Sequence, residues 1–309
     1  MKKFKEILFL RNLKRVGKAT IYGKYWNVLN ESEDIDDLLL KIKEMESKYS
    51  EEDLQIAKDG AEKLYDFILN SDIHVITVFD EEYPKKLQIM GNKKPLFLYI
   101  KGNVESLTKP NIAVIGTRKP SYLSKSFEEN LVKNIVNSTE FVVVSGLALG
   151  CDKIAHKTTV DENNVTIAVL PSGVNVIKPA SHKKLAEDII SAGGCLVSEY
   201  NPDAKVTRGS YVERDAIVAA LCDAIFVVEC GVKSGTMHTV NAANDYKRQI
   251  YSYLPYERPE GSYDGNEFIL NENYDATRVE DIGEFIEDLK ILYNKKTRKS
   301  AVTNLDDFK

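Results

Sequence analysis

Cysteine and histidine are scarce in this 309-residue sequence, which contains four of each. The cysteines have no Cys-x-x-Cys spacing, and three of them lie in or beside apolar runs, so reduced structural thiols are favoured over disulfides. The histidines have no spacing that makes a metal site. This pattern is typical of a cytoplasmic protein, and we expect neither a metal ion nor another cofactor.

Long hydrophobic runs are also missing. No run approaches the roughly 18 apolar residues that a membrane span requires. The N-terminal stretch MKKFKEILFLRNLKRVGK has no small-residue cleavage site after a hydrophobic segment. We therefore expect neither membrane insertion nor export, and a composition of 43% apolar and 29% charged residues predicts a soluble globular protein.

A broad positive surface is absent too. The net charge is −5, and residues 256–309 account for it with 13 Asp and Glu against 8 Lys and Arg. Residues 1–255 are balanced, with 34 charged residues of each sign. A nucleic-acid partner is compatible with this distribution, because a local basic cleft is enough for phosphate contacts.

Residues 1–72 predict a small helical domain, because apolar residues such as Ile7, Leu10 and Leu13 recur at helical spacing. The stretch LKRVGKATI lies between two helical segments and is similar to a helix-hairpin-helix turn, which presents backbone amides to DNA phosphate. A SAM-like or helix-hairpin-helix-like domain is expected. Ala19 occupies the position of the usual second glycine, so a packing module with a tight turn is the favoured interpretation.

Residues 73–255 predict the main domain, an α/β fold with a parallel sheet. Strand-like and helical segments alternate from residue 111 onward, which implies βαβ units. The runs Ile112–Ile115 and Phe141–Val144 are too short and too β-branched for helices, and continuous apolar runs suit strands that are buried on both faces. Residues 256–309 predict an acidic C-terminal extension with one amphipathic helix and a charged tail.

Glycine-containing turns follow several of the predicted strands and offer groups that bind anions. The first, Gly116-Thr117-Arg118, combines backbone amides with a planar arginine donor. Ser145-Gly146 and a turn at Gly173 follow the next two strands, and Lys233-Ser234-Gly235-Thr236 opens a helix whose N-terminal amides favour phosphate. Each turn alone is explained better as a capped strand-to-helix connection. Four turns at corresponding positions predict one anion-binding pocket beyond the carboxyl ends of the strands.

A catalytic constellation is harder to find in the sequence. Asp152 lies four residues before His156 on a predicted helix, so the two side chains share one face and could form an acid–base pair, but an orienting or capping contact is favoured. No Ser-His-Asp order and no paired-carboxylate motif stands out. The predicted pocket is therefore interpreted as a binding site, and we expect no enzymatic activity.

The order of these segments resembles the DNA-processing protein A family, also called DprA or Smf. The matching stretches, found between about residue 74 and residue 255, are FDEEYPKKL, LFLYIKGN, IAVIGTRKPS, VVSGLALGCDKIAH, IAVLPSGVNVIKPASHKKL, LVSEY and DAIFVVECGVKSGTMHT. The resemblance implies an extended Rossmann-like fold behind a small helical N-terminal domain. It also implies single-stranded DNA as the ligand, a homodimer, and a role in loading a RecA-type recombinase during uptake of transforming DNA.

The resemblance also assigns residues to the DNA-binding pocket. Those on family motif positions are Arg118, Ser145, Gly146, Gly173, Arg214, Lys233, Ser234, Gly235 and Thr236, with Gly116 and Thr117 in the same first turn and Lys178, Lys183 and Lys184 close enough in sequence to help. The main cations are expected to be Arg118, Arg214 and Lys233. The sequence departs from the family at Arg214-Asp215-Ala216, where an Arg-Asn-Arg run is usual. This departure removes one cation and adds an anion, which predicts weaker DNA binding or a different ligand.

Other functions remain open. A related branch of the same fold hydrolyses nucleotide N-glycosidic bonds with a PGGxGTxxE loop, which implies a nucleotide hydrolase or a nucleotide-binding sensor as alternatives. The position of the catalytic glutamate holds Thr239 here, so hydrolysis would lack its usual carboxylate, whereas sensing would not need it. A scaffold that kept the fold but lost tight ligand binding, for example in phage defence, is supported by Asp215 and Ala216.

Overall fold

The computed structural model describes residues 1–257, 263–272 and 274–306, with side chains as far as Lys295. In these residues nine strands form one sheet, in the order β1-β2-β6-β5-β4-β3-β7-β8-β9. The strands from β6 to β9 across the sheet pair in parallel, whereas β2 pairs antiparallel with both β1 and β6. The strands are β1 (Ile73–Thr77), β2 (Phe97–Gly102), β3 (Asn111–Ile115), β4 (Val142–Ser145), β5 (Thr166–Val169), β6 (Cys195–Ser198), β7 (Ala224–Val227), β8 (Gln249–Tyr253) and β9 (Ala276–Val279).

The central strands are buried on both faces, as their continuous apolar runs predict. In β3, Ile112 and Val114 belong to the core on one face of the sheet, while Ala113 and Ile115 belong to the core on the other. Helices α6, α7 and α12 complete the first core, and α9, α10 and α11 complete the second. The helices of this domain are α6 (Tyr122–Ser138), α7 (Cys151–Asp161), α8 (Lys183–Ser191), α9 (Ser210–Leu221), α10 (Thr236–Asp245), α11 (Asp264–Asn271) and α12 (Ile282–Asp306).

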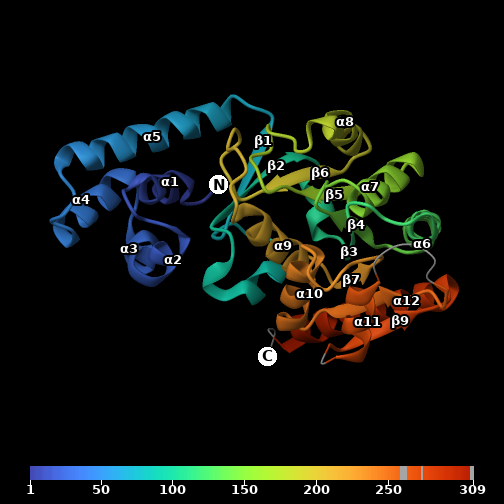
Figure 1. The fold of residues 1–309 in the computed structure, drawn as a ribbon. Helices are drawn as coiled ribbons and strands as arrows, with labels where there is room; N and C mark the ends of the chain where they lie inside the picture. Colours follow the sequence, from blue (N-terminus) through green and yellow to red (C-terminus); the bar gives the residue numbers. More distant parts are fainter. Residues whose placement is uncertain (258–262, 273, 307–309) are drawn as a thin grey trace.

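The helical N-terminal domain lies at one end of the molecule, beside the edge strand β1 and its neighbour β2 (Figure 1). Phe4 packs edge-on against Phe97 and Tyr99 of β2, with ring centroids 5.4 and 6.0 Å apart. Ser50 and Asp53 form a capping box that satisfies the first amides of the longest helix in this domain. Its helices are α1 (Phe4–Asn12), α2 (Lys18–Thr20), α3 (Trp26–Glu31), α4 (Ile35–Met45) and α5 (Glu51–Leu69), with a π-helical turn at Ile21–Tyr25.

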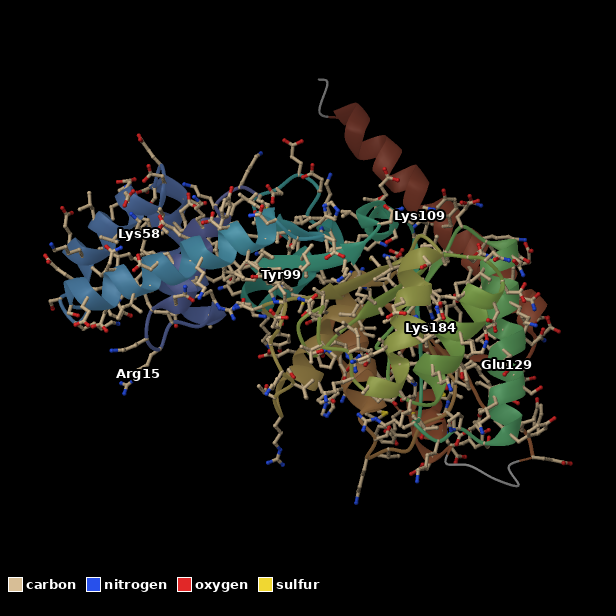
Figure 2. The ribbon with its side chains drawn as sticks, turned by 90° about the horizontal axis from the view of Figure 1, so that it is seen from above. Arg15, Lys58, Tyr99, Lys109, Glu129 and Lys184 are labelled. Atoms are coloured by element: carbon tan, nitrogen blue, oxygen red, sulfur yellow. The ribbon has the colours of Figure 1, made fainter. Side chains whose placement is uncertain are left out.

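The turn after α1, which is similar in sequence to a helix-hairpin-helix turn, is held by ion pairs. Lys14 lies 2.7 Å from Asp53, and Lys18 lies 2.6 Å from Glu199 of the main domain. Arg15 has a left-handed φ of 63° and points into solvent (Figure 2). Lys14 therefore ties the turn to α5 within the helical domain, and Lys18 ties it to the main domain.

The predicted α/β fold with a small helical N-terminal domain is confirmed. The sheet extends beyond residue 255, however, because β9 in the acidic segment pairs in parallel with β8. The stretch after Tyr293, predicted as a charged tail, continues α12 as far as Asp306. Within the described part of the chain, no helix combines the length and the apolar character that crossing a membrane requires.

Candidate functional site

A cleft of about 490 Å³ opens beyond the carboxyl ends of β3, β4 and β7. The chain runs outward from β3 through β4, β5 and β6, and then returns to β7 on the opposite side of β3. This reversal is the topological switch point, where open α/β sheets bind their ligands. The cleft therefore lies where the sequence predicts a ligand site.

Eight of the predicted site residues line this cleft, and four do not. The eight are Gly116, Thr117, Arg118, Gly146, Arg214, Ser234, Gly235 and Thr236. Ser145 is buried and donates its hydroxyl to the Val114 carbonyl at 2.8 Å, which ties β4 to β3. Gly173 is packed beneath the backbone of Asn201, and the exposed side chains of Lys178 and Lys233 lie outside the lining.

The first turn is fixed before any ligand arrives. The Thr117 amide donates to the Glu229 carbonyl at 2.7 Å, and the Thr117 carbonyl accepts from the first amide of α7 at 3.1 Å. The Thr236 hydroxyl donates to the Gly116 carbonyl at 3.1 Å, which joins this turn to the start of α10. Arg118 is left exposed, with its guanidinium 5.8 Å from the centre of the Tyr211 ring. The loop is thus preorganised around an exposed cation that has no ion pair in the described part of the chain.

Arg214 reaches the cleft but is held by the protein. Its side chain is buried, its Nε donates to Asp215 at 2.8 Å, and Nη1 donates to the carbonyls of Gly146 and of Val169, the latter at 3.1 Å. A Cβ at Gly146 would lie 1.7 Å from Nη1, so a larger residue there would displace the Arg214 guanidinium. Burial raises the pKa of Asp215, although the neighbouring Arg214 opposes the shift. The charge of Arg214 is largely used within the protein.

The acid–base pair considered for Asp152 and His156 does not form. The Asp152 carboxylate accepts the amides of Gly146 and Ala148, each at 3.1 Å, and so orients the second turn. His156 is fully buried, with Nδ1 2.8 Å from the Thr166 hydroxyl. Burial lowers the pKa of His156 to about 3, which keeps the ring neutral near pH 7. Both residues therefore have structural roles.

The cleft also contains residues that the sequence did not single out. Arg208, Tyr211 and His238 line it, and Arg208 is exposed, with no ion pair in the described part of the chain. Arg208 precedes α9 by two residues, a position from which an arginine can face the same edge as the helix start. The path of the long connection between β6 and α9 decides this placement, and that path is not encoded in any local pattern.

Among the described side chains, none of the groups that could hold a metal ion or expose a reactive thiol is found. No group of three or more His, Cys, Asp and Glu side chains there is arranged to hold a metal ion. All four cysteines are buried. The cleft is lined instead by arginines, hydroxyls and the N-terminus of α10, a set that suits an anionic ligand, and its two carboxylates, Asp152 and Asp215, are held by backbone amides and by Arg214.

Fold and cleft together define a Rossmann-like α/β protein in which cations, hydroxyls and helix-terminal amides converge at the switch point of the sheet. Comparison with known proteins supplies the family. Residues 74–290 match the family model of DNA recombination-mediator protein A, and the chain belongs to this family. The family predicted from the sequence motifs is confirmed.

Two individual relatives agree with the assignment of this chain to the DNA recombination-mediator protein A family. The chain is 33% identical to Protein Smf of Synechocystis over 210 residues, which cover 64% of this chain and 52% of that protein. It is 31% identical to DNA processing protein DprA of Streptococcus pneumoniae over 196 residues, 63% of this chain and 68% of that protein. The chain thus spans about half the length of the Synechocystis relative.

Solved structures show the same likeness. DNA processing protein A from Helicobacter pylori, described with its single-stranded DNA binding mode, is 30% identical, with a TM-score of 0.62 over 70% of this chain and 95% of that chain. DprA from Streptococcus pneumoniae is 24% identical, with a TM-score of 0.71 over 90% of this chain and 95% of that chain. The second structure shares the fold, including most of the helical domain's length.

Proposed function

We propose that the cleft binds single-stranded DNA through its phosphate backbone. The observation that carries this proposal is the convergence of two exposed arginines, Arg118 and Arg208, with the N-terminus of α10 in one open cleft. Arginine forks and helix-terminal amides are the groups that proteins use for phosphate. The Helicobacter pylori relative, which binds single-stranded DNA, supports the choice of ligand. Backbone contacts alone give little sequence preference.

We further propose that the protein acts without catalysis, as a homodimer that loads a RecA-type recombinase onto DNA taken up in transformation. The carboxylates that line the cleft support the first part, because Asp152 is held by two backbone amides and Asp215 by Arg214. Thr239, at the position of the hydrolase glutamate, is buried and cannot replace a carboxylate. Family membership supports the remaining parts.

A nucleotide-binding sensor is the second candidate, and the size of the cleft favours it. A volume of about 490 Å³ falls within the range of small-molecule sites, roughly 300–1,000 Å³. One titration series separates the candidates: the full chain against oligo-dT, ATP and ADP-ribose at low and moderate salt. Binding of oligo-dT that weakens steeply with salt supports the proposal. Nucleotide binding without DNA binding would favour the sensor, hydrolysis of ADP-ribose a glycosidase, and no binding of any ligand a scaffold.

Asp215→Asn is expected to tighten oligo-dT binding by about twofold to fivefold, because it removes a negative charge beside the phosphate path, worth roughly 0.5–1 kcal/mol. The side-chain oxygen of the introduced asparagine can still accept the hydrogen bond from Arg214 Nε. Ala216 is left unchanged because it packs from α9 against the core. Fluorescence anisotropy measures the change. Asp59→Asn, an exposed residue of α5, is the charge-matched control and should leave the affinity unchanged. Equal tightening in both variants would show a general charge effect.

A further inference from the structure

A second groove, of about 690 Å³, adjoins the cleft and runs between α6 and α7. Arg118 lines both the cleft and the groove, so it stands on their shared rim. The cleft has the volume of a small-molecule site, and a polymer that enters it must also leave it. The groove offers such an exit, because it begins at Arg118 on the rim of the cleft.

The groove is cationic on a protein that is acidic overall. Six cations line it, Arg118, Lys119, Lys125, Lys133, Lys153 and Lys157, against the three carboxylates of Glu129, Asp161 and Glu162. The chain as a whole carries a net charge of −5. A local excess of three positive charges therefore stands out against the average surface, and it attracts anionic polymers.

The excess is confined to the half of the groove nearest the cleft. In the far half, Lys157 pairs with Asp161 at 2.6 Å and Lys133 with Glu162 at 3.5 Å. In the near half, Lys119, Lys125 and Lys153 have no ion pair in the part of the chain that the structure describes. Glu129, an exposed residue of α6 (Figure 2), lies in sequence between Lys125 of the near half and Lys133 of the far half. Unpaired lysines gathered next to an arginine repel one another unless an anion lies among them.

The near half also offers apolar surface between its cations. Pro120, Ile154 and Leu149 contribute to the groove, and Leu149 is 47% exposed. A nucleic-acid strand presents phosphates that need cations and also sugar and base faces that need apolar contact. An acidic peptide could also pair with the lysines, but it would not account for the continuity of the groove with the phosphate-binding cleft at Arg118.

We propose that a DNA strand held in the cleft continues across Arg118 into the near half of this groove, where Lys125 of α6 and Lys153 of α7 contact successive phosphates. This inference rests on the proposed function and deepens it, because it assigns the path by which the strand leaves the cleft. It makes affinity depend on oligonucleotide length. A strand that only fills the cleft does not reach Lys125 or Lys153, whereas a longer strand does.

The test compares two charge-matched double variants, Lys125→Ala with Lys153→Ala and Lys133→Ala with Lys157→Ala. Both remove two exposed lysines from one groove, so both change the net charge equally. Each is titrated with oligo-dT of about four and about twenty nucleotides, lengths that bracket single-strand site sizes. The near-half variant should bind the long strand about tenfold more weakly, with a salt slope lower by about 1.4, and the short strand as the wild type does. The far-half variant should match the wild type for both.

The possible failures are distinguishable. Equal losses of affinity in the two double variants would overturn the inference in favour of a general charge effect. The inference also fails if the near-half variant loses no affinity, or if it loses the same affinity for short and long strands. If Arg118→Ala weakens both lengths while the near-half variant does not, the inference fails and the proposed function stands. If the wild type binds neither length, both fail.

A cross-linking experiment gives an independent readout. All four native cysteines are fully buried, so a single surface cysteine can be labelled selectively. Lys125→Cys carrying a benzophenone label should cross-link to the long oligo-dT, and Lys133→Cys should do so far less. Cross-linking that is stronger at position 133 would overturn the assigned path.

Discussion

Arg118→Ala is expected to weaken oligo-dT binding by about tenfold to a hundredfold. Arg118 is exposed on the rim of the cleft, has no ion pair in the described residues, and is followed by the lysines of the second groove. A charge-assisted hydrogen bond to phosphate is worth about 1.5–3 kcal/mol, and each 1.4 kcal/mol is a factor of ten. Losing one phosphate contact should also reduce the logarithmic salt slope by about 0.7. Anisotropy titrations across a salt series measure both quantities.

Two further substitutions separate the effect of the Arg118 side chain in the cleft from that of positive charge alone. Arg118→Lys keeps the charge but loses the planar fork, so the salt slope should stay close to that of the wild type while the affinity falls by an intermediate amount. Arg15→Ala makes the same charge change on the exposed turn of the helical domain (Figure 2). It should not affect binding. A loss at Arg15 comparable to that at Arg118 would instead place a DNA contact on the helix-hairpin-helix-like turn.

The fold could be predicted from local sequence because its determinants are local. The run Ile112–Ile115 is apolar at every position, and the structure buries alternate residues of it in the cores on opposite faces of the sheet. The order of the strands could not be predicted, because it depends on the return from β6 to β7 across the sheet. The strand β9 was missed for a related reason: Ala276–Val279 is half exposed at an edge and has no continuous apolar run.

The sequence located the edge of the sheet at which the cleft opens, and it named part of the cleft's lining. Glycine turns after strands located the edge, and Gly116, Gly146 and Gly235 do line one cleft. What the sequence could not show is which cations are already used. Arg214 is bound by the Gly146 and Val169 carbonyls, which are 68 and 45 residues away in the chain. Arg208, in contrast, lines the cleft and has no ion pair among the described residues, while Lys233 lies outside the lining.

Arg214→Met is expected to lower the free energy of unfolding by about 3–5 kcal/mol, which is the largest stability effect that we predict in the site. Removing one member of a buried ion pair leaves the other charge uncompensated. Here the variant leaves the mostly buried Asp215 carboxylate, 15% exposed, without its cation, and it leaves the Gly146 and Val169 carbonyls without their donor. Urea unfolding followed by circular dichroism measures the loss. Arg214→Met combined with Asp215→Leu should recover part of it, because no buried charge remains.

The dependence of this loss on pH identifies its source. Burial already raises the pKa of Asp215 above 3.8 in the folded protein, and removing the Arg214 cation raises it further. A carboxyl whose folded-state pKa is raised binds its proton more tightly in the folded protein than in the unfolded chain, so its penalty grows as the pH rises through that pKa and disappears as the pH falls toward 3.8. The difference in unfolding free energy between Arg214→Met and the wild type should therefore be smaller at about pH 5 than at about pH 7.5. An equal difference at both values would assign the loss to the two stranded carbonyls rather than to Asp215.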